Sequence, residues 1–449
     1  MTSFPEANAK FASYLFHRLS EAHFSDNVLV SPINAANSLG LLLLASRNEQ
    51  ANELEKVLHW DEMEDSDRCS NRRHLEAARS SGRSTAKLRA QERSESCPNT
   101  SLQPQPHPEP AHPKPKPKPE PEPSPSAEKN APDSESETPK EVHTAFSRIL
   151  AVLNKPNPNY TLSFASKFYG DYAVSFLQKF IYNALKLYLT DVVGANIHNA
   201  PEEVRKLINL WTEVQTHGEI KELFPKDSFD SLAQLLLVNV LYFKGQWDIK
   251  FDKEITTEAP FYAHDSDHYT VQLMQRKGIY NTAITDIANV QVQVLEIPYK
   301  NNELSFFILL PTDYSTEALQ QLEDGLSYKN LLDWPWILKP EEVAVSIPKF
   351  SLEKSLYLDE LLDLLNLSDS ERANFSGATT TEGVTLTRFL HDTFIEIDED
   401  GGEEAGSCCF HRHSHQEPVK FMANHPFIFY LLHKSTESIL ALGRFAKPE

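Results

Sequence analysis

A short segment near the carboxyl end carries the side chains of this sequence that are best suited to bind a metal. It contains the adjacent cysteines Cys408 and Cys409, followed by three histidines at every second position, His411, His413 and His415. Alternate residues of an extended chain point to the same side, so the three imidazoles share one face. Imidazole and thiolate groups suit zinc or copper. The spacing matches no closed structural site, however, and we favour the other interpretation, an exposed histidine-rich loop without a metal.

Motifs of the common enzyme classes are missing from the sequence. It has no glycine-rich phosphate loop, no HExxH pair and no GxSxG element. No nucleophile is therefore placed by a recognisable motif. We expect a protein that is not an enzyme and holds no cofactor.

The composition excludes several other classes of protein. A formal net charge of -21 argues against broad nucleic-acid binding, because such binding needs a surplus of Lys and Arg. No uninterrupted apolar stretch reaches the roughly 18 residues of a membrane helix, and the first residues do not resemble a cleaved secretory signal. Four cysteines imply no disulfide framework. We expect a cytoplasmic monomer, with the nucleus or release without a cleaved signal as alternative locations.

Helices are predicted in the first 60 residues. Apolar residues between 11 and 19 recur at the spacing of an amphipathic helix. Ser31 and Pro32 supply an N-cap hydroxyl and a proline at the first helical position. They precede an almost wholly apolar stretch over 33–45, which predicts a buried helix, and a third helix is expected over 52–58.

A polar, proline-rich stretch interrupts this pattern over residues 62–138. Its second half alternates proline with charged residues, and proline both fixes φ and removes a backbone donor. We therefore predict a disordered, extended insert between the third helix and a fourth helix over 142–153. Because the first half of the insert is locally basic, a binding or nuclear-import element is the alternative interpretation.

Long β-rich runs follow the insert, and they decide the fold class. Apolar, β-branched or aromatic residues concentrate in five predicted strands, 161–169, 235–243, 291–297, 305–310 and 343–347. Helices at the front followed by many long strands predict an α+β fold with large, mainly antiparallel sheets. We expect a single domain over residues 1–449.

A family resemblance becomes specific at the carboxyl end. The stretch from Phe421 to Pro448 reads FMANHPFIFYLLHKSTESILALGRFAKP, and it resembles the carboxy-terminal signature of the serpin family. Further segments fall in the serpin order, namely NVLVSPINAANS near the start, LLVNVLYFKGQWDIKF from Leu236 and IPKF from Ile347. The chain resembles the intracellular, ovalbumin-like (clade B) branch, in which the insert takes the place of a variable loop.

The resemblance implies a fold of three β-sheets and about nine helices, with an exposed reactive-centre loop over residues 399–420. In inhibitory serpins a serine or cysteine protease cleaves this loop. The loop then inserts as a new central strand of the largest sheet and carries the acyl-linked protease with it. The resemblance therefore implies a serine-type endopeptidase inhibitor with a protease as its partner.

The hinge of the implied loop departs from the inhibitory pattern. Glu399, Gly401 and Glu403 match that pattern, whereas Gly402 replaces a hydroxyl residue and Glu404 replaces an alanine. By alternation, the side chains at positions 402 and 404 share the side that we expect to be buried after insertion. Burying an unpaired glutamate costs on the order of several kcal/mol, and glycine disfavours strands. We expect weak or lost inhibition.

The position of the reactive bond in the loop can be counted in two ways, and the two ways disagree. Counting from the hinge places it at His415–Gln416, whereas counting back from the ANHPF motif places it at His413–Ser414. Arg412 offers a trypsin-like site but lies off both registers. We favour a solvated loop charge for this arginine.

Two further groups of residues have roles that the resemblance implies. Ser31, Asn34, Asn239 and His391 match the polar positions beneath the strands that open. At the top of the sheet, Trp247 packs where the loop is inserted, and Lys349 pairs with Glu399. The alternative to weak inhibition is a non-inhibitory interaction or storage-like protein that acts through the insert or the histidine-rich loop.

Overall fold

A computed structural model of the chain describes residues 3–63, 141–263, 268–364, 373–401 and 417–449. All of these residues belong to one compact unit. The predicted insert over 62–138 lies outside the described residues, apart from its first two positions. No helix in the described ranges has the length and apolar character needed to cross a membrane.

The helices at the front form where the sequence predicts them. Ser3 caps α1 (Phe4–Ala22), and Ser31 caps α2 (Pro32–Ala45) by accepting a hydrogen bond from the Asn34 amide. Every residue of α2 except Leu44 is buried. The other α-helices of the described residues are α3 (Asn48–Val57), α6 (Glu141–Leu153), α7 (Gln178–Tyr188), α8 (Pro201–Gln215), α9 (Thr316–Gly325), α10 (Tyr328–Leu332), α11 (Trp334–Ile337) and α12 (Asp359–Leu364).

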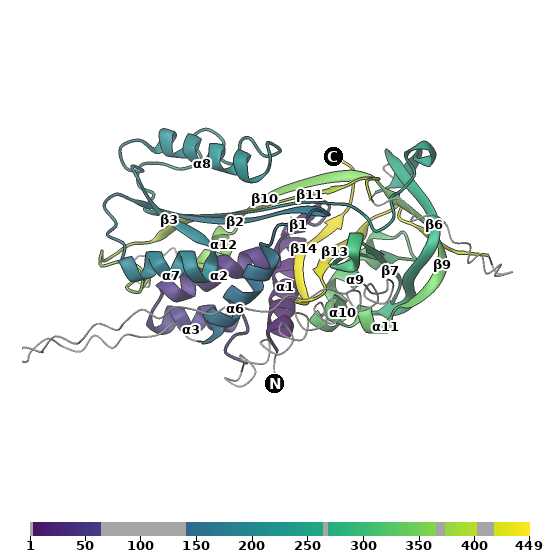
Figure 1. The fold of residues 1–449 in the computed structure, drawn as a ribbon, viewed down its shortest axis with the longest axis horizontal. Coiled ribbons are helices and arrows are strands. Elements are labelled where there is room, and N and C mark those ends of the chain that lie inside the picture. The colour runs from purple at the N-terminus through teal and green to yellow at the C-terminus, as the bar shows by residue number, and fades with distance from the viewer. Residues whose placement is uncertain (1–2, 64–140, 264–267, 365–372, 402–416) are drawn as a thin grey trace, which may run out of the picture. The chain divides into compact units, whose positions relative to one another are not determined.

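A five-stranded sheet contains two of the predicted strands and lies between helices. Its order is β10 (Phe350–Tyr357), β11 (Leu386–Ile397), β4 (Leu235–Gly245), β2 (Tyr160–Asp171) and β3 (Thr190–Ala195). Figure 1 shows α8 on one face of this sheet and α2 and α7 on the other. Strand β4 is buried along almost its whole length because both faces are covered.

The other strands are hydrogen-bonded into one nine-stranded sheet. Its order is β1 (Val28–Val30), β14 (Ser438–Phe445), β13 (Phe427–His433), β8 (Leu304–Pro311), β7 (Val290–Pro298), β6 (His268–Ile287), β9 (Lys339–Pro348) and β12 (Val419–Met422), and β5 (Thr257–Tyr262) pairs with β6. The predicted α+β fold with large, mainly antiparallel sheets is confirmed. The described residues form two hydrogen-bonded sheets rather than three separate ones, because the 20-residue strand β6 pairs with β9 over residues 273–282 and with β7 over residues 281–287.

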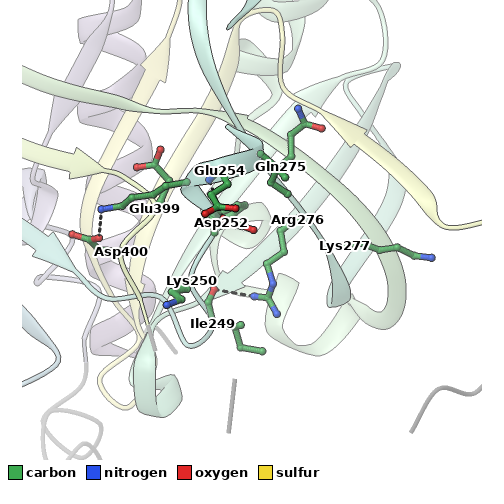
Figure 2. Close-up of a pocket in the computed structure, with 12 residues that line it drawn as sticks. Ile249, Lys250, Asp252, Glu254, Gln275, Arg276, Lys277, Glu399 and Asp400 are labelled. Atoms are coloured by element: carbon green, nitrogen blue, oxygen red, sulfur yellow. Dashed lines mark hydrogen bonds and ion pairs between the residues drawn. The ribbon is translucent and has the colours of Figure 1, made fainter. Parts of the chain in front are cut away.

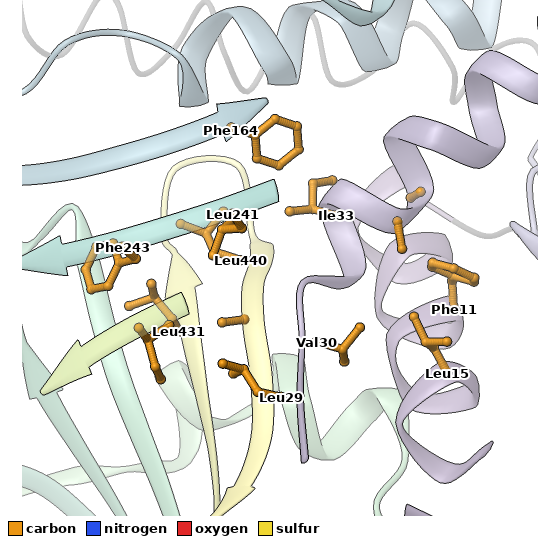
Figure 3. Packing of buried hydrophobic residues seen from close by; sticks show 14 of the residues in the cluster. Phe11, Leu15, Leu29, Val30, Ile33, Phe164, Leu241, Phe243, Leu431 and Leu440 are labelled. Atoms are coloured by element: carbon orange, nitrogen blue, oxygen red, sulfur yellow. The ribbon is translucent and has the colours of Figure 1, made fainter. Parts of the chain in front are cut away.

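The main core lies between the front helices and the two sheets. Figure 3 shows Phe11 and Leu15 of α1 and Ile33 of α2 packed toward Leu241 of β4 and Leu440 of β14. All five side chains are at most 3% exposed. This packing buries one face of each sheet, and it fixes α2 directly beneath the five-stranded sheet.

Candidate functional site

The centre of the five-stranded sheet is a contact between two parallel strands, β4 and β11, which we call the seam. Its register runs from Leu235 opposite Leu386 to Lys244 opposite Glu396, with one irregularity between positions 386 and 388. No other strand lies between them in the described residues. A new central strand could form here only if this whole ladder of hydrogen bonds separated.

The four polar residues expected beneath the opening strands meet at the seam. Asn239 of β4 lies directly opposite His391 of β11. The Asn239 amide donates to Ser38 Oγ at 2.8 Å and to the Asn34 carbonyl oxygen at 3.2 Å. The Ser31 backbone amide donates to His391 Nε2 at 2.9 Å. The first turns of α2 therefore bond to both strands of the seam.

His391 is held as a neutral imidazole by its surroundings. It is fully buried, and burial lowers its pKa to about 3. Its Nε2 also lies 2.9 Å from Thr393 Oγ1, whereas its Nδ1 has no hydrogen-bond partner among the described residues. A charged imidazole would therefore be costly here, because both hydrogen bonds that the ring makes within the described part of the chain use Nε2 as an acceptor.

Sequence reasoning missed four residues of this network. Ser38 and Thr393 bond to the expected residues directly, as described above. Ser166 of β2 donates from Oγ to Asn34 Oδ1 at 3.3 Å, and it accepts from the Asn37 amide at 3.2 Å. The periodicity of α2 could have indicated the helix partners, because positions 34, 37 and 38 lie on one face. Only the tertiary fold brings Ser166 beside them.

At the upper end of the seam, the chain after β11 is held by backbone and side-chain contacts. The Trp247 indole donates to the Asp398 carbonyl oxygen at 2.7 Å, and its ring stacks on Tyr299 with centroids 4.3 Å apart. Lys349 Nζ lies 2.7 Å from Glu399 Oε2, and Thr256 donates to Glu399 Oε1. These contacts tie the start of the implied loop to the chain just after β4, to Thr256 and to the chain just after β9.

The Glu399 carboxylate is charged although its side chain is only 4% exposed. Burial raises its pKa, but hydrogen bonds from Lys349, from its own backbone amide and from Thr256 outweigh burial and hold the pKa below its usual range. Two more lysines bind the acidic run that ends at this point. Lys244 lies 2.8 Å from Glu396, and Lys253 of the 3₁₀ turn η1 (Lys253–Ile255) lies 2.8 Å from Asp400.

An open pocket of about 810 Å³ adjoins these contacts. Figure 2 shows Glu399 and Asp400 on one side of it and Gln275, Arg276 and Lys277 of β6 on the other. The Arg276 guanidinium donates to the Ile249 carbonyl oxygen at 2.8 Å. Acidic and basic groups alternate around the pocket, so its lining has little net charge.

Gly401 is the last described residue of the implied hinge. It forms a parallel bridge with Trp247. A Cβ at this position would meet the Lys250 backbone at 2.8 Å, so the close approach requires glycine. The hinge positions Gly402, Glu403 and Glu404 lie outside the described residues. So do the candidate bonds at His415–Gln416 and His413–Ser414, together with Arg412.

The metal candidates His411, His413 and His415 also lie outside the described residues. In the described part of the chain, no group of three or more His, Cys, Asp or Glu side chains is arranged to hold a metal.

Known proteins with similar sequences and similar structures belong to a single family. The family described as "Serpin (serine protease inhibitor)" matches residues 6–99 and 127–448. Human Serpin B4 and human leukocyte elastase inhibitor are each 31% identical to the chain, with all of both sequences covered. The crystal structure of uncleaved ovalbumin superposes with a TM-score of 0.76 at 24% identity, covering 99% of this chain and 100% of the other. This last likeness bears on the fold alone.

Proposed function

Because the chain belongs to the serpin family, in its ovalbumin-like (clade B) branch, we propose that it presents a reactive-centre loop but inhibits proteases weakly or not at all. Serpins are protease inhibitors and not enzymes themselves. The partner that we propose is a serine or cysteine protease that cleaves the loop, and the location is the cytoplasm.

In this proposal the seam is the place where a cleaved loop would insert. The network of Ser31, Asn34, Asn239 and His391 acts as a gate that keeps β4 and β11 paired. The Glu399–Lys349 pair and Trp247 hold the loop's first residues at the top of the sheet. These roles are supported by the direct hydrogen bonds from α2 to both strands and from Trp247 to the chain after β11.

The observation that carries the proposal is the direct pairing of β4 with β11. Since the seam is already hydrogen-bonded along its length, insertion must exchange one ladder for another. The incoming strand therefore has to contribute side chains that pack well against the core and residues that favour β-structure. Glu404 and Gly402 supply neither, because one brings an unpaired charge and the other weakens a strand. Slow insertion lets hydrolysis release the protease, so the chain behaves as a substrate.

The test is to incubate the protein with a panel of serine and cysteine proteases and to separate covalent complexes on denaturing gels. We expect cleaved protein and little complex. The double variant Gly402→Thr/Glu404→Ala should raise the ratio of complex to cleaved product at least about tenfold, which corresponds to 1.4 kcal/mol. The control is Glu403→Ala, the same chemical change on the opposite side of the strand, which should leave the ratio unchanged. Efficient complex formation by the unaltered chain would contradict the proposal.

A second candidate function is a non-inhibitory interaction or storage-like role through the insert or the histidine-rich loop. The observation behind it is the locally basic and proline-rich sequence of residues 62–138. On the two sides of this stretch, the Trp60 ring lies 5.5 Å from Phe146 and 6.4 Å from His143. The residues that precede and follow the insert therefore pack against each other in the core. If the insert directs the protein to the nucleus, a fluorescent fusion lacking residues 64–140 should stay in the cytoplasm while the full chain is nuclear. Equal distributions would remove that role.

A further inference from the structure

Asp392 lies next to His391 on β11 but points to the other face of the five-stranded sheet. The register with β4 runs without a shift from Arg388 to Glu396, so side chains alternate strictly over this stretch. His391 and Thr393 face α2, where they bond to each other. Leu390 and Phe394, on the same side as Asp392, belong to the apolar cluster that includes α8. A carboxyl group is thus placed among apolar side chains.

The Asp392 carboxyl is incompletely satisfied in this position. The residue has no exposed surface. Its Oδ2 accepts a hydrogen bond from Ser355 of β10 at 2.6 Å, whereas Oδ1 has no partner in the described ranges. Val240 of β4 is its neighbour across the seam. An ionised carboxylate here would therefore lack both water and a counter-charge, which is costly.

The other titratable or charged groups near this face do not neutralise Asp392. They are Glu353 and Tyr357 of β10, Arg388 and Glu396 of β11, Tyr242 and Lys244 of β4, Lys167 and Tyr169 of β2, and His217 and Glu219 of the segment after α8. Arg388 lies 3.3 Å from Asp359 and Lys244 lies 2.8 Å from Glu396, so both cations have other partners. Glu353 is the neighbour that acts on Asp392, and its negative charge disfavours ionisation further. Lys167 instead lies over the Trp211 ring, 5.5 Å from its centroid.

Burial therefore raises the pKa of Asp392 to about 7, with the Ser355 hydrogen bond lowering it and Glu353 raising it. The paired seam holds Asp392 as a neutral acid below that pH. On the opposite face, burial lowers the pKa of His391 and holds it as a neutral base. Two adjacent residues of β11 are therefore both uncharged in the closed seam: Asp392 because it keeps its proton, and His391 because it does not take one up.

We propose that Asp392 is a positioning residue that controls the seam through its proton: proton binding stabilises the pairing of β4 with β11, and proton loss favours their separation. The proposal rests on the proposed function only for the idea that the sheet opens at the seam. It does not require that the loop can insert there. His391 acts in the opposite sense, because proton uptake by its imidazole favours separation.

The signs follow from proton linkage. When β4 and β11 separate, Asp392 reaches water and its pKa returns toward about 3.9. Between about pH 4 and 7 the open form then binds fewer protons, so its population rises about tenfold per pH unit as the pH rises. At His391 the open form of the seam binds more protons between the lowered pKa and about 6.5. The His391 contribution therefore makes the open population fall as the pH rises. The two effects nearly cancel over the shared range.

Hydrogen exchange by mass spectrometry of the uncleaved, full-length chain tests this proposal. The readout is the exchange of amides in residues 235–244 and 386–396 at pH 5.5 and 7.5, corrected for the intrinsic pH dependence of amide exchange. From the two opposed slopes, we expect opening of the seam to change by less than about fivefold in the unaltered chain. Asp392→Asn should make opening about tenfold rarer at pH 7.5 than at pH 5.5, because only His391 remains. His391→Gln should make opening of the seam roughly 25-fold more frequent at pH 7.5 than at pH 5.5, because only the Asp392 effect remains.

The control is Glu437→Gln, which removes an exposed acid of the turn between β13 and β14, outside the five-stranded sheet, and should keep the nearly flat profile. An Asp392→Asn profile that matches the unaltered chain would overturn the proposal. If Asp392→Asn does not fold, Ser355→Ala in the His391→Gln background replaces it. Loss of the Ser355 hydroxyl should extend the rise in opening to a higher pH before it levels off, because this hydrogen bond lowers the pKa of Asp392 in the closed form, and an unchanged upper limit would contradict the proposal. No protease is present, so these results are independent of whether the loop inhibits.

Discussion

Asn239 and His391 lie directly opposite each other across the seam, and each is hydrogen-bonded to the first turns of α2. A change at Asn239 should therefore weaken both the seam and its attachment to the helix. Asn239→Ala leaves the Ser38 hydroxyl and the Asn34 carbonyl without their donor, which costs about 1–3 kcal/mol. We expect thermal unfolding at a lower temperature, measured by circular dichroism. The control Asn199→Ala removes an exposed hydrogen bond to Asn196 Oδ1 and should change the midpoint little. An unchanged midpoint in Asn239→Ala would show that the network is dispensable.

The buried imidazole makes a prediction about stability in acid. His391 has a folded pKa of about 3 against about 6.5 when unfolded, so the unfolded chain binds more protons between these values. The unaltered protein should lose free energy of unfolding relative to His391→Gln as the pH falls from 6.5 to about 4, by about 1.4 kcal/mol per unit at most. Urea denaturation of both proteins at several pH values measures this difference. The comparison cancels the opposite contribution of Asp392, which both proteins share. A difference that does not vary with pH would contradict the assigned burial.

Removing one partner of the Glu399–Lys349 ion pair should destabilise the protein more than removing both partners together. Lys349→Gln leaves a nearly buried carboxylate without its cation and should destabilise the protein by about 1–2 kcal/mol, since the lysine itself is partly exposed. Because the folded pKa of Glu399 is lowered, the pair contributes above its unfolded pKa, near 4.5, and this contribution is lost as the pH falls through the folded value. Chemical denaturation at pH 7 and pH 3 tests both statements.

The double variant Lys349→Gln/Glu399→Gln is the matched control for this pair. It removes the buried charge together with its partner, so it should recover part of the stability lost in the single variant. A double variant that is no more stable than the sum of the two single changes predicts would mean that the two residues are not coupled in this way.

Aromatic contacts at the two ends of the insert predict that the insert is separable from the fold. Trp60 packs between Phe4 and Phe146 and is fully buried, so Trp60→Ala should cost about 3–5 kcal/mol. Replacing residues 64–140 by a short Gly/Ser linker should change the thermal midpoint by only a few degrees, because loop-closure entropy varies slowly with length. Differential scanning calorimetry compares these variants. A deletion as damaging as Trp60→Ala would show that the insert contributes to the core.

The sequence predicted those features whose signal is local. The cap at Ser31, the apolar run of α2 and the β-rich runs of β4, β7 and β8 are visible in short windows, and all became helices or strands as expected. The pairing of strands is not local. Strand β6 runs on from its pairing with β9 into its pairing with β7, and no short-range pattern indicates which strands a long strand will pair with.

The candidate site could be predicted in part for the same reason. Asn239, His391, Trp247 and Lys349 followed from the family's motif order, and the structure brings them to the seam and its upper end. Ser166 and Asp392 carry no motif. Their importance arises from neighbours that are far apart in sequence, such as Asn34 for Ser166 and Ser355 for Asp392. A polar residue in a β-rich run could have been noticed, but its partner could not.

The measurement that tests the central claim most directly is the thermal unfolding midpoint before and after a single cut within residues 410–416. Insertion of a new central strand would raise the midpoint greatly, because the sheet gains a fully paired strand. We predict little change after cutting the unaltered chain and a large rise after cutting Gly402→Thr/Glu404→Ala. An equally large rise in both proteins would contradict the claim, since it would show that the loop inserts despite Gly402 and Glu404.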